Sequence, residues 1–444
     1  MAQGSAFLVA SLKPWSHPGL APSAIWALRP RPSGKIQPVN VHLSPTLPAA
    51  KRLSGFTYAI RNIVAEAKKV ERSGRTVRYL NIGDPVAFGF RTPLHLVEAA
   101  SKAMRDGHNG YGPSVGLAEA REAVAAEYTS RGMPVSPDRV VLTAGTSEGI
   151  ELALNAAADA GDEVLVPMPT YPLYTAVLHR IGARAVFYRT DPAHGWLPDV
   201  EHVRSLIHPT TRALVVIDPN NPTGAMYSRG VRLGLLELAE RHGIMLLADE
   251  VYGDLAFDGP VAPIASLAPD APVVSFSSLS KAYLAPGWRA GWLAVGRSDR
   301  LDEILAGIKK LADGRLCSTV PMQYAITAAL TGDRSHQASF REALRERAAL
   351  TTDRLNAVSG MTCTPPMAAF YAMPRVALPA GVTDEQFVLQ LLHETGVLVV
   401  HGSGFGLPAS EGYFRVVFLA APAVLADVYD RIATFTRSFL GTRH

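Results

Sequence analysis

The most informative stretch of this chain reads Ser275-Phe-Ser-Ser-Leu-Ser-Lys281-Ala-Tyr-Leu-Ala-Pro-Gly-Trp-Arg289-Ala-Gly-Trp292. It places a single lysine directly after several hydroxyl groups, with an arginine eight residues further on. A lysine amine can form a Schiff base with an aldehyde. Serine hydroxyls and a permanently charged guanidinium can hold a phosphate by hydrogen bonds. The stretch therefore predicts a site that binds a phosphate-bearing aldehyde covalently at Lys281.

The composition is that of an ordinary globular protein. The chain has 444 residues, of which 48% are hydrophobic and 18% are charged, which leaves room for two or three domains and a large core. It contains no uninterrupted apolar run of eighteen residues or more, so we expect no membrane span. Its two cysteines, Cys317 and Cys363, lie too far apart for a disulfide framework or a zinc site, so we expect a reducing, cytoplasmic location.

The first fifty residues differ from the rest of the chain. No acidic residue precedes Glu66, whereas seven basic residues do, so residues 1–65 carry a charge of +7 and the rest of the chain carries 4 − 7 = −3. Its lack of periodicity predicts a disordered extension, and its basic composition leaves a transit peptide as the alternative. No basic stripe with interleaved aromatic residues follows in the body of the chain, so we expect no nucleic-acid partner.

Short apolar strands alternate with helical patterns between residue 96 and about residue 300. The expected strands are 139–143, 163–166, 213–217, 244–248 and 273–276, and the expected helices include 117–128 and 148–158. Continuous apolar strands separated by helices are typical of a mostly parallel sheet that is covered by helices on both faces. The pattern therefore predicts an α/β fold.

The chain is expected to divide into four regions. These are an N-terminal extension (1–50), an arm with part of a small domain (51–95), a large domain (96–330) and a smaller α+β domain (331–444) that ends in a helix over 424–439. In a parallel sheet, ligands bind at the carboxyl ends of the strands. Polar segments that follow the expected strands should therefore share one pocket.

Three polar segments follow expected strands in this way. Gly145-Thr-Ser-Glu-Gly149 opens a helix, and a helix that begins with small residues is an anion-binding site. Asn220-Asn-Pro-Thr-Gly224 is a turn by composition alone, and Ala248-Asp-Glu-Val-Tyr252 carries an aspartate that could also serve as a helix cap. Arg415 lies in an apolar strand and needs either a structural acid or a bound anion as its partner.

Taken together and in order, these segments resemble the signature of pyridoxal-phosphate-dependent aminotransferases of fold type I, class I/II. The resemblance extends from about residue 51 to the C-terminus and is closest to the alanine aminotransferase branch. It also includes Pro169-Thr-Tyr171-Pro-Leu-Tyr174 and Asn109-Gly-Tyr111-Gly-Pro-Ser-Val-Gly116. It implies a fold type I enzyme that works by a ping-pong Schiff-base mechanism, with no metal.

The resemblance also implies a role for each matching residue. Lys281 would hold the cofactor and move the proton, Asp249 would pair with the ring nitrogen, and Tyr171 would stack on the ring. Asn221 and Tyr252 would hold the 3′-oxygen. The phosphate ligands would be Gly145, Thr146, Ser147, Ser278, Ser280 and Arg289. Tyr111 would reach the phosphate of a neighbouring subunit, which requires a homodimer.

The substrates implied by the resemblance are an amino acid and a 2-oxo acid. Arg415 would bind the α-carboxylate, and Tyr58, Arg61 and Gly83 would complete the substrate site. If Tyr58 covers the site, a small amino acid such as alanine is favoured, with glutamate and 2-oxoglutarate as the exchanging pair. Arg61 could equally be an exposed residue at a helix start. His401, which stands where a proline is common, could face the substrate.

Three other classes of function are alternatives. Gly145-Thr-Ser147-Glu-Gly149 also satisfies the pattern of a serine hydrolase nucleophile, for which His393 or His401 would be the partner, but this reading leaves Lys281 and Asp249 unexplained. Relatives of the fold also catalyse decarboxylation, elimination, replacement or oxidation. Related domains occur in transcription regulators, but no helix-turn-helix pattern precedes the body of this chain.

Overall fold

The computed structural model describes residues 47–50, 52 and 59–441, with the backbone alone for 59–62. All the elements below belong to the compact unit that begins at Ala50. The predicted extension falls almost entirely outside the described residues, as does Tyr58. No helix in the described ranges combines the length and the apolar character needed to cross a membrane.

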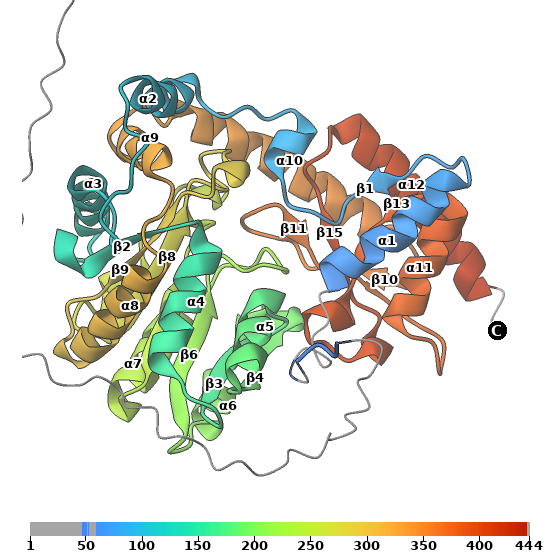
Figure 1. Ribbon diagram of the computed structural model, residues 1–444. Coiled ribbons are helices and arrows are strands. Elements are labelled where there is room, and N and C mark those ends of the chain that lie inside the picture. The colour runs from blue at the N-terminus through green and yellow to red at the C-terminus, as the bar shows by residue number, and fades with distance from the viewer. Residues whose placement is uncertain (1–46, 51, 53–58, 442–444) are drawn as a thin grey trace, which may run out of the picture. The chain divides into compact units, whose positions relative to one another are not determined.

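An eight-stranded sheet forms the centre of the described chain (Figure 1). Its strands run in the order β2-β9-β8-β7-β6-β3-β4-β5. The pairs β8-β7, β7-β6, β6-β3 and β3-β4 are parallel, whereas β2-β9, β9-β8 and β4-β5 are antiparallel. The expected mostly parallel sheet is therefore confirmed. The strands are β2 (Val140–Thr143), β3 (Glu163–Met168), β4 (Arg184–Asp191), β5 (Leu197–Pro198), β6 (Thr211–Ile217), β7 (Met245–Asp249), β8 (Val273–Ser278) and β9 (Gly291–Val295).

Both faces of this sheet are buried at its centre, because the central strands carry apolar residues at consecutive positions rather than at every second one. In β6, Ala213, Val215 and Ile217 belong to one apolar cluster, and Leu214 and Val216 belong to the other. The first cluster includes residues of α4, α5 and α8, which lie in front of the sheet in Figure 1. The second includes residues of α3, α6 and α7. Side chains of successive strand residues point to opposite faces, so this packing covers the sheet on both sides.

The helices are α1 (Ala59–Arg72), α2 (Leu94–Arg105), α3 (Ala118–Ser130), α4 (Thr146–Ala157), α5 (Pro172–Ile181), α6 (Val200–Ser205), α7 (Arg229–His242), α8 (Asp302–Gly314), α9 (Val320–Thr331), α10 (Ser335–Asn356), α11 (Asp384–Thr395) and α12 (Pro422–Gly441).

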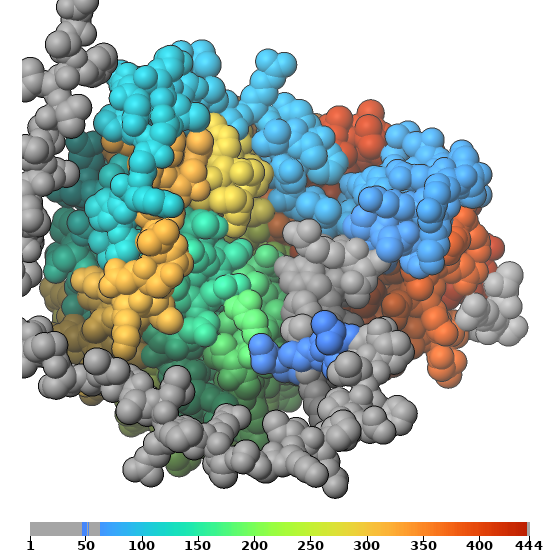
Figure 2. Space-filling view, viewed as in Figure 1, coloured from blue at the N-terminus to red at the C-terminus, as the bar shows by residue number. Residues whose placement is uncertain are grey.

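The C-terminal part of the chain forms small sheets packed against helices. One sheet has the order β11-β15-β14, and two further pairs are β10-β12 and β1-β13. The last pair joins the N-terminal strand β1 to the C-terminal part in parallel. Figure 2 shows α1, in blue, lying against the orange and red C-terminal elements, and α1 contacts α11 and β14. The strands are β1 (Arg78–Tyr79), β10 (Met361–Thr362), β11 (Tyr371–Ala372), β12 (Arg375–Val376), β13 (Val397–Leu398), β14 (Val400–His401) and β15 (Phe414–Val417). The domain boundaries at residues 95 and 330 stay a prediction.

The parallel register aligns the carboxyl ends of the central strands. Ile217 at the end of β6 pairs with Asp249 at the end of β7, and Asp249 pairs with Phe276 of β8. The polar segments that follow these strands consequently begin at one edge of the sheet. This edge is where a doubly covered parallel sheet binds its ligand.

We expect Leu214→Ala to lower the free energy of unfolding by about 3 kcal/mol, because it leaves a cavity in the fully buried centre of β6. The matched control is Leu311→Ala in α8, where the side chain is 39% exposed and the same deletion should cost about 1 kcal/mol or less. Denaturant titration of the two variants beside the parent protein measures both values. Equal losses in the two variants would contradict this assignment of the core.

Candidate active site

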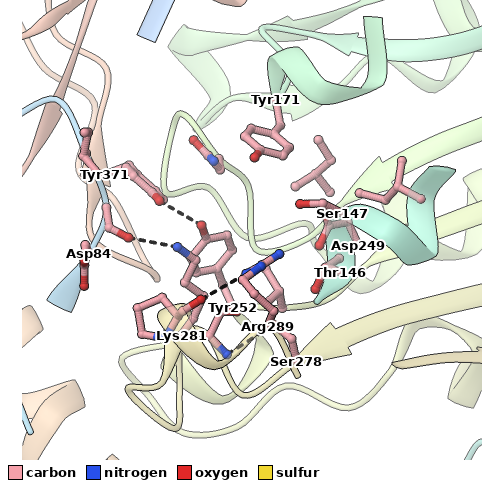
Figure 3. A pocket seen from close by; sticks show the side chains of 18 of the residues that line it. Asp84, Thr146, Ser147, Tyr171, Asp249, Tyr252, Ser278, Lys281, Arg289 and Tyr371 are labelled. Carbon is pink, nitrogen blue, oxygen red and sulfur yellow. Dashed lines mark hydrogen bonds between the residues drawn. The ribbon is translucent and has the colours of Figure 1, made fainter. Parts of the chain in front are cut away.

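A cavity of about 580 Å³ opens at the carboxyl edge of the large sheet (Figure 3). Its volume lies in the range of small-molecule sites. Most of the residues predicted from the sequence lie in its wall, although they come from distant parts of the chain. Those residues are Gly83, Thr146, Ser147, Tyr171, Asn221, Asp249, Tyr252, Ser278, Ser280, Lys281, Arg289 and Arg415.

Lys281 follows the end of β8 and extends into the cavity. Its Nζ donates a hydrogen bond to the carbonyl oxygen of Gly83 at 2.9 Å and lies 5.6 Å from the ring centroid of Phe370. Burial lowers the pKa of the Lys281 amine, Asp84 and Asp249 raise it, and Arg415 and Arg289 lower it. The net pKa is about 8. At neutral pH most of this amine is therefore protonated, and a minor fraction is neutral.

Asp249 is the last residue of β7 and is only 4% exposed. Tyr174 donates its hydroxyl to Oδ2 at 3.3 Å, while the buried Oδ1 has no hydrogen-bond partner within the described ranges. Burial raises the pKa of Asp249 to about 6. In Figure 3, Lys281 lies on one side of the cavity and Asp249 on the other. An amine and a carboxylate with perturbed pKa values in one cavity mark a functional site.

The start of α4 forms a cradle for an anion. Helix α4 begins at Thr146 without a side-chain cap, and the buried Oγ1 of Thr146 has no partner among the residues that the structure describes. A Cβ atom at Gly145, which has φ +83°, would lie 2.3 Å from a guanidinium nitrogen of Arg289. The missing side chain thus lets this guanidinium approach the helix end, where backbone N–H groups and the helix dipole favour negative charge.

Arg289 is held in place beside this helix end. It donates to the carbonyl oxygens of Ala144 at 3.0 Å and Pro286 at 3.1 Å, and its backbone adopts the left-handed conformation at φ +52°. Ser278 lies nearby and its hydroxyl accepts the backbone N–H of Ser280 at 3.2 Å. A guanidinium, hydroxyl groups and free N–H groups therefore converge on one end of the cavity.

Arg415 lies at the other end of the cavity on β15 and is 2% exposed. It donates to Asn221 Oδ1 at 3.0 Å and to the carbonyl oxygen of Asn81 at 2.5 Å. Its guanidinium carbon lies 4.8 Å from the ring centroid of Tyr371 and 4.7 Å from that of Phe405. These contacts hold the guanidinium in the wall of the cavity, and a guanidinium can bind a carboxylate through two parallel hydrogen bonds.

Two residues in the wall that carry polar side chains, Asp84 and Tyr371, are missing from the sequence-based prediction. Tyr371 shares a hydrogen bond of 2.8 Å with the hydroxyl of Tyr252, and Asp84 lies beside the carbonyl group that holds Lys281. Asp84 directly follows Gly83, which was predicted to belong to the substrate site, so its position in the sequence could have indicated it. Tyr371 lies in Ala369-Phe-Tyr371-Ala, where no motif singles it out.

Some predicted residues do not meet in this cavity. Tyr111 is 88% exposed and lies outside the wall, and the side chain of Arg61 on α1 is not described. His401 lines a different cavity, where its Nδ1 lies 2.8 Å from the hydroxyl of Ser403. Over the described residues, no histidine lines the cavity that contains Ser147, which argues against a serine hydrolase. The same residues contain no cluster of histidine, cysteine and carboxylate groups that could hold a metal ion.

We expect Lys281 to react with acetic anhydride in the ligand-free protein with a midpoint near pH 8, because only the neutral amine is nucleophilic and burial lowers its pKa. Competitive labelling followed by mass spectrometry gives this midpoint. Asp84→Asn removes an opposing negative charge and should lower the midpoint, whereas Arg289→Gln removes a positive charge and should raise it. A midpoint above about 10, as for an ordinary lysine, would show that the pKa of the Lys281 amine is not lowered.

Comparison with known proteins agrees with this geometry. The model of the family "Aminotransferase class I and II" matches residues 76–432. The chain is 36% identical to the glutamate-pyruvate aminotransferase AlaA of Haemophilus influenzae, over 88% of this chain and 98% of that protein. It is 39% identical to the alanine aminotransferase of Mycobacterium bovis, over 87% of this chain and 92% of that protein. The solved structure of alanine aminotransferase from Pyrococcus furiosus superposes with a TM-score of 0.85 at 39% identity, covering 88% of this chain and all of that one. The chain therefore belongs to the class I and II aminotransferases and has their fold type I architecture.

Proposed function

We propose that this aminotransferase exchanges the amino group between L-alanine and 2-oxoglutarate, with pyruvate and L-glutamate as the products, and that pyridoxal phosphate is its cofactor. The observation that carries the proposal is the meeting of Lys281, Asp249 and Arg415 in one cavity. The names of the relatives, alanine aminotransferase and glutamate-pyruvate aminotransferase, support the choice of substrates.

The residues present fit pyridoxal phosphate. Its phosphate matches the cradle formed by Gly145, Thr146, Ser147, Ser278, Ser280 and Arg289. The Oδ1 atom of Asp249 suits a protonated ring nitrogen, because a buried carboxylate oxygen that lacks a hydrogen bond is costly. Tyr171 lines the cavity as a ring to stack on, and Asn221 and Tyr252 offer polar groups to the 3′-oxygen.

When bound, pyridoxal phosphate supplies an aldehyde that bonds to amines and a protonated ring that draws electron density from the Cα atom of the amino acid. Asp249 keeps the ring nitrogen protonated, and Tyr174 holds the Asp249 side chain through Oδ2. The pKa of Asp249, raised to about 6 by burial, leaves it ionised at neutral pH. The carboxylate can therefore stabilise a positive charge at this position.

Lys281 is the group that moves protons. With its pKa lowered to about 8, the amine would hold the aldehyde of the cofactor, and in its neutral form it would take the Cα proton of the substrate and return it. Proton transfer by a positioned side chain contributes about 10²–10⁴-fold in rate. The carbonyl oxygen of Gly83 holds the amine inside the cavity.

Arg415 orients the substrate. Its buried guanidinium can form two parallel hydrogen bonds with the α-carboxylate, which would fix the direction of the Cα–H bond. Ile82 and Gly83 line the cavity, so a small side chain would fit beside them. The roles of Tyr58 and Arg61 in closing over the substrate stay predictions.

We further propose a homodimer. Tyr111 is 88% exposed and lies away from the cavity of its own chain, as expected of a residue that reaches the phosphate of a neighbouring subunit. Apolar residues of the nearby helix α2 are also exposed, with Leu94 at 68% and Met104 at 42%. Exposed apolar groups of this kind often mark an interface. A cytoplasmic location stays a prediction and is supported by the two free cysteines.

A panel of amino donors, each mixed with the cofactor-loaded enzyme in a single half-reaction, tests the proposed function. L-Alanine and L-glutamate should each yield their 2-oxo acid, and kcat/KM for L-alanine should exceed that for L-leucine or L-tyrosine by at least about tenfold, since a small site excludes larger side chains. Stopped-flow absorbance follows the cofactor and chromatography identifies the product.

The control for this panel is Lys281→Ala, which should form no 2-oxo acid at a measurable rate. If no donor gives a 2-oxo acid with the parent enzyme, the proposed transamination is wrong. If an aromatic or branched donor is preferred to L-alanine, the proposed substrate is wrong, but the proposed transamination is supported.

A further inference from the structure

Tyr371 contacts three groups that serve different parts of the proposed reaction. It lies on β11, is 2% exposed and lines the cavity. Its hydroxyl lies 2.8 Å from the hydroxyl of Tyr252, and its ring centroid lies 4.8 Å from the guanidinium carbon of Arg415. Figure 3 shows Tyr371 directed toward Tyr252, beside Lys281.

The third contact is with the backbone at Gly83. A Cβ atom at Gly83 would lie 2.3 Å from the Tyr371 hydroxyl oxygen, so this hydroxyl packs directly on the glycine Cα. The carbonyl oxygen of the same glycine accepts the hydrogen bond from Lys281. One phenol side chain thus touches the segment that holds the lysine, the tyrosine that faces the cofactor site and the arginine that faces the substrate.

The hydrogen bond between the two tyrosines has a preferred direction once the cavity contains an anionic oxygen. Each hydroxyl has one proton to donate. If Tyr371 donates to Tyr252, the proton of Tyr252 is left to point into the cavity. Hydrogen bonds in such a chain polarise and strengthen one another in a site of low dielectric.

The ring of Tyr371 acts separately from its hydroxyl. Its distance to Arg415 is typical of a cation–π contact, and Phe405 provides a second ring at 4.7 Å. A guanidinium held against aromatic rings keeps its fork of donors in one orientation. The position of Arg415 therefore depends on the Tyr371 ring, and the polarity of Tyr252 depends on the Tyr371 hydroxyl.

We propose that Tyr371 is a positioning residue that orders the Tyr252 hydroxyl toward the cofactor and the Arg415 guanidinium toward the substrate carboxylate. The proposal rests on the proposed function, because it gives Tyr252 and Arg415 their cofactor and substrate roles. It assigns two separable effects to one side chain, one to the hydroxyl and one to the ring.

Tyr371→Phe tests the hydroxyl alone. Because the ring stays, KM for L-alanine should remain within about twofold, while kcat should fall about two- to tenfold, the effect expected from one neutral hydrogen bond. The midpoint of the pH titration of the cofactor's visible absorbance should shift upward by a few tenths of a unit, since the anionic 3′-oxygen loses support. This titration is read without turnover.

Tyr371→Leu tests the ring. Loss of the cation–π contact should raise KM for both L-alanine and pyruvate by about three- to thirtyfold. If the leucine variant fails to fold, the phenylalanine variant still decides the proposal. A kcat and a titration midpoint equal to those of the parent enzyme in Tyr371→Phe would overturn it.

A double-mutant cycle shows whether Tyr371 acts through Tyr252. Tyr252→Phe should shift the titration midpoint more than Tyr371→Phe, and the double variant should match Tyr252→Phe alone. Additive shifts would mean that the two hydroxyls act independently, which would overturn the proposed route.

Tyr429→Phe is the matched control. Tyr429 is 1% exposed, its hydroxyl lies 2.6 Å from that of Thr351, and neither residue lines the cavity. Its variant should lose thermal stability but keep the parent titration midpoint and KM.

If the parent enzyme binds the cofactor and does not transaminate L-alanine, the proposed function fails, while the titration still reports on Tyr371. If the parent enzyme does not bind the cofactor, both proposals fail.

Discussion

One cavity takes the amine of Lys281 and the carboxylate of Asp249 out of bulk water, and the surrounding structure compensates for the cost of that desolvation. Burial moves the two pKa values toward neutrality, to about 8 and about 6. The carbonyl oxygen of Gly83 and the hydroxyl of Tyr174 support the two groups from opposite sides. At physiological pH the acid is then ionised and a minor fraction of the amine is neutral, and the neutral amine is the form that can accept a proton.

The arrangement of the parallel sheet explains why this cavity is buried. Because β6, β7 and β8 are parallel and in register, the segments after them open at one edge and deliver Asn221, Asp249 and Lys281 together. The C-terminal part of the chain adds Arg415 and Tyr371 on neighbouring strands of a small sheet. Pairing of β1 with β13 brings the adjacent segment at Gly83 to the same place. The large sheet, the small C-terminal sheet and the segment at Gly83 thus each contribute residues to the cavity wall.

The central strands could be predicted from the sequence because their apolar runs are continuous and end in polar turns. The expected strand over 213–217 lies within β6, and the expected helix over 148–158 differs from α4 by two residues at its start and one at its end. The start matters, since α4 begins at Thr146 and its free N–H groups belong to the anion cradle. That boundary depends on the glycine before it and on the approach of Arg289, which is a contact between distant residues.

Other features could not be predicted because they depend on pairing across the chain. Strand β9 is antiparallel to both of its neighbours, and nothing in its apolar run Gly291–Val295 indicates this direction. Tyr371 belongs to a strand of two residues, too short for a periodic signal, and gains its importance only from Tyr252, Gly83 and Arg415. The second cavity around His401 likewise required three-dimensional information, since the chain position of His401 left open whether it faces the substrate.

The covalent role of Lys281 is the central claim, and reductive trapping measures it most directly. The purified, cofactor-loaded protein is treated with borohydride, digested and analysed by mass spectrometry. The account predicts that the phosphopyridoxyl mass appears on the peptide that contains Lys281 and that Lys281→Ala abolishes it. A stable adduct on another lysine, or none at all in the parent protein, would contradict the account.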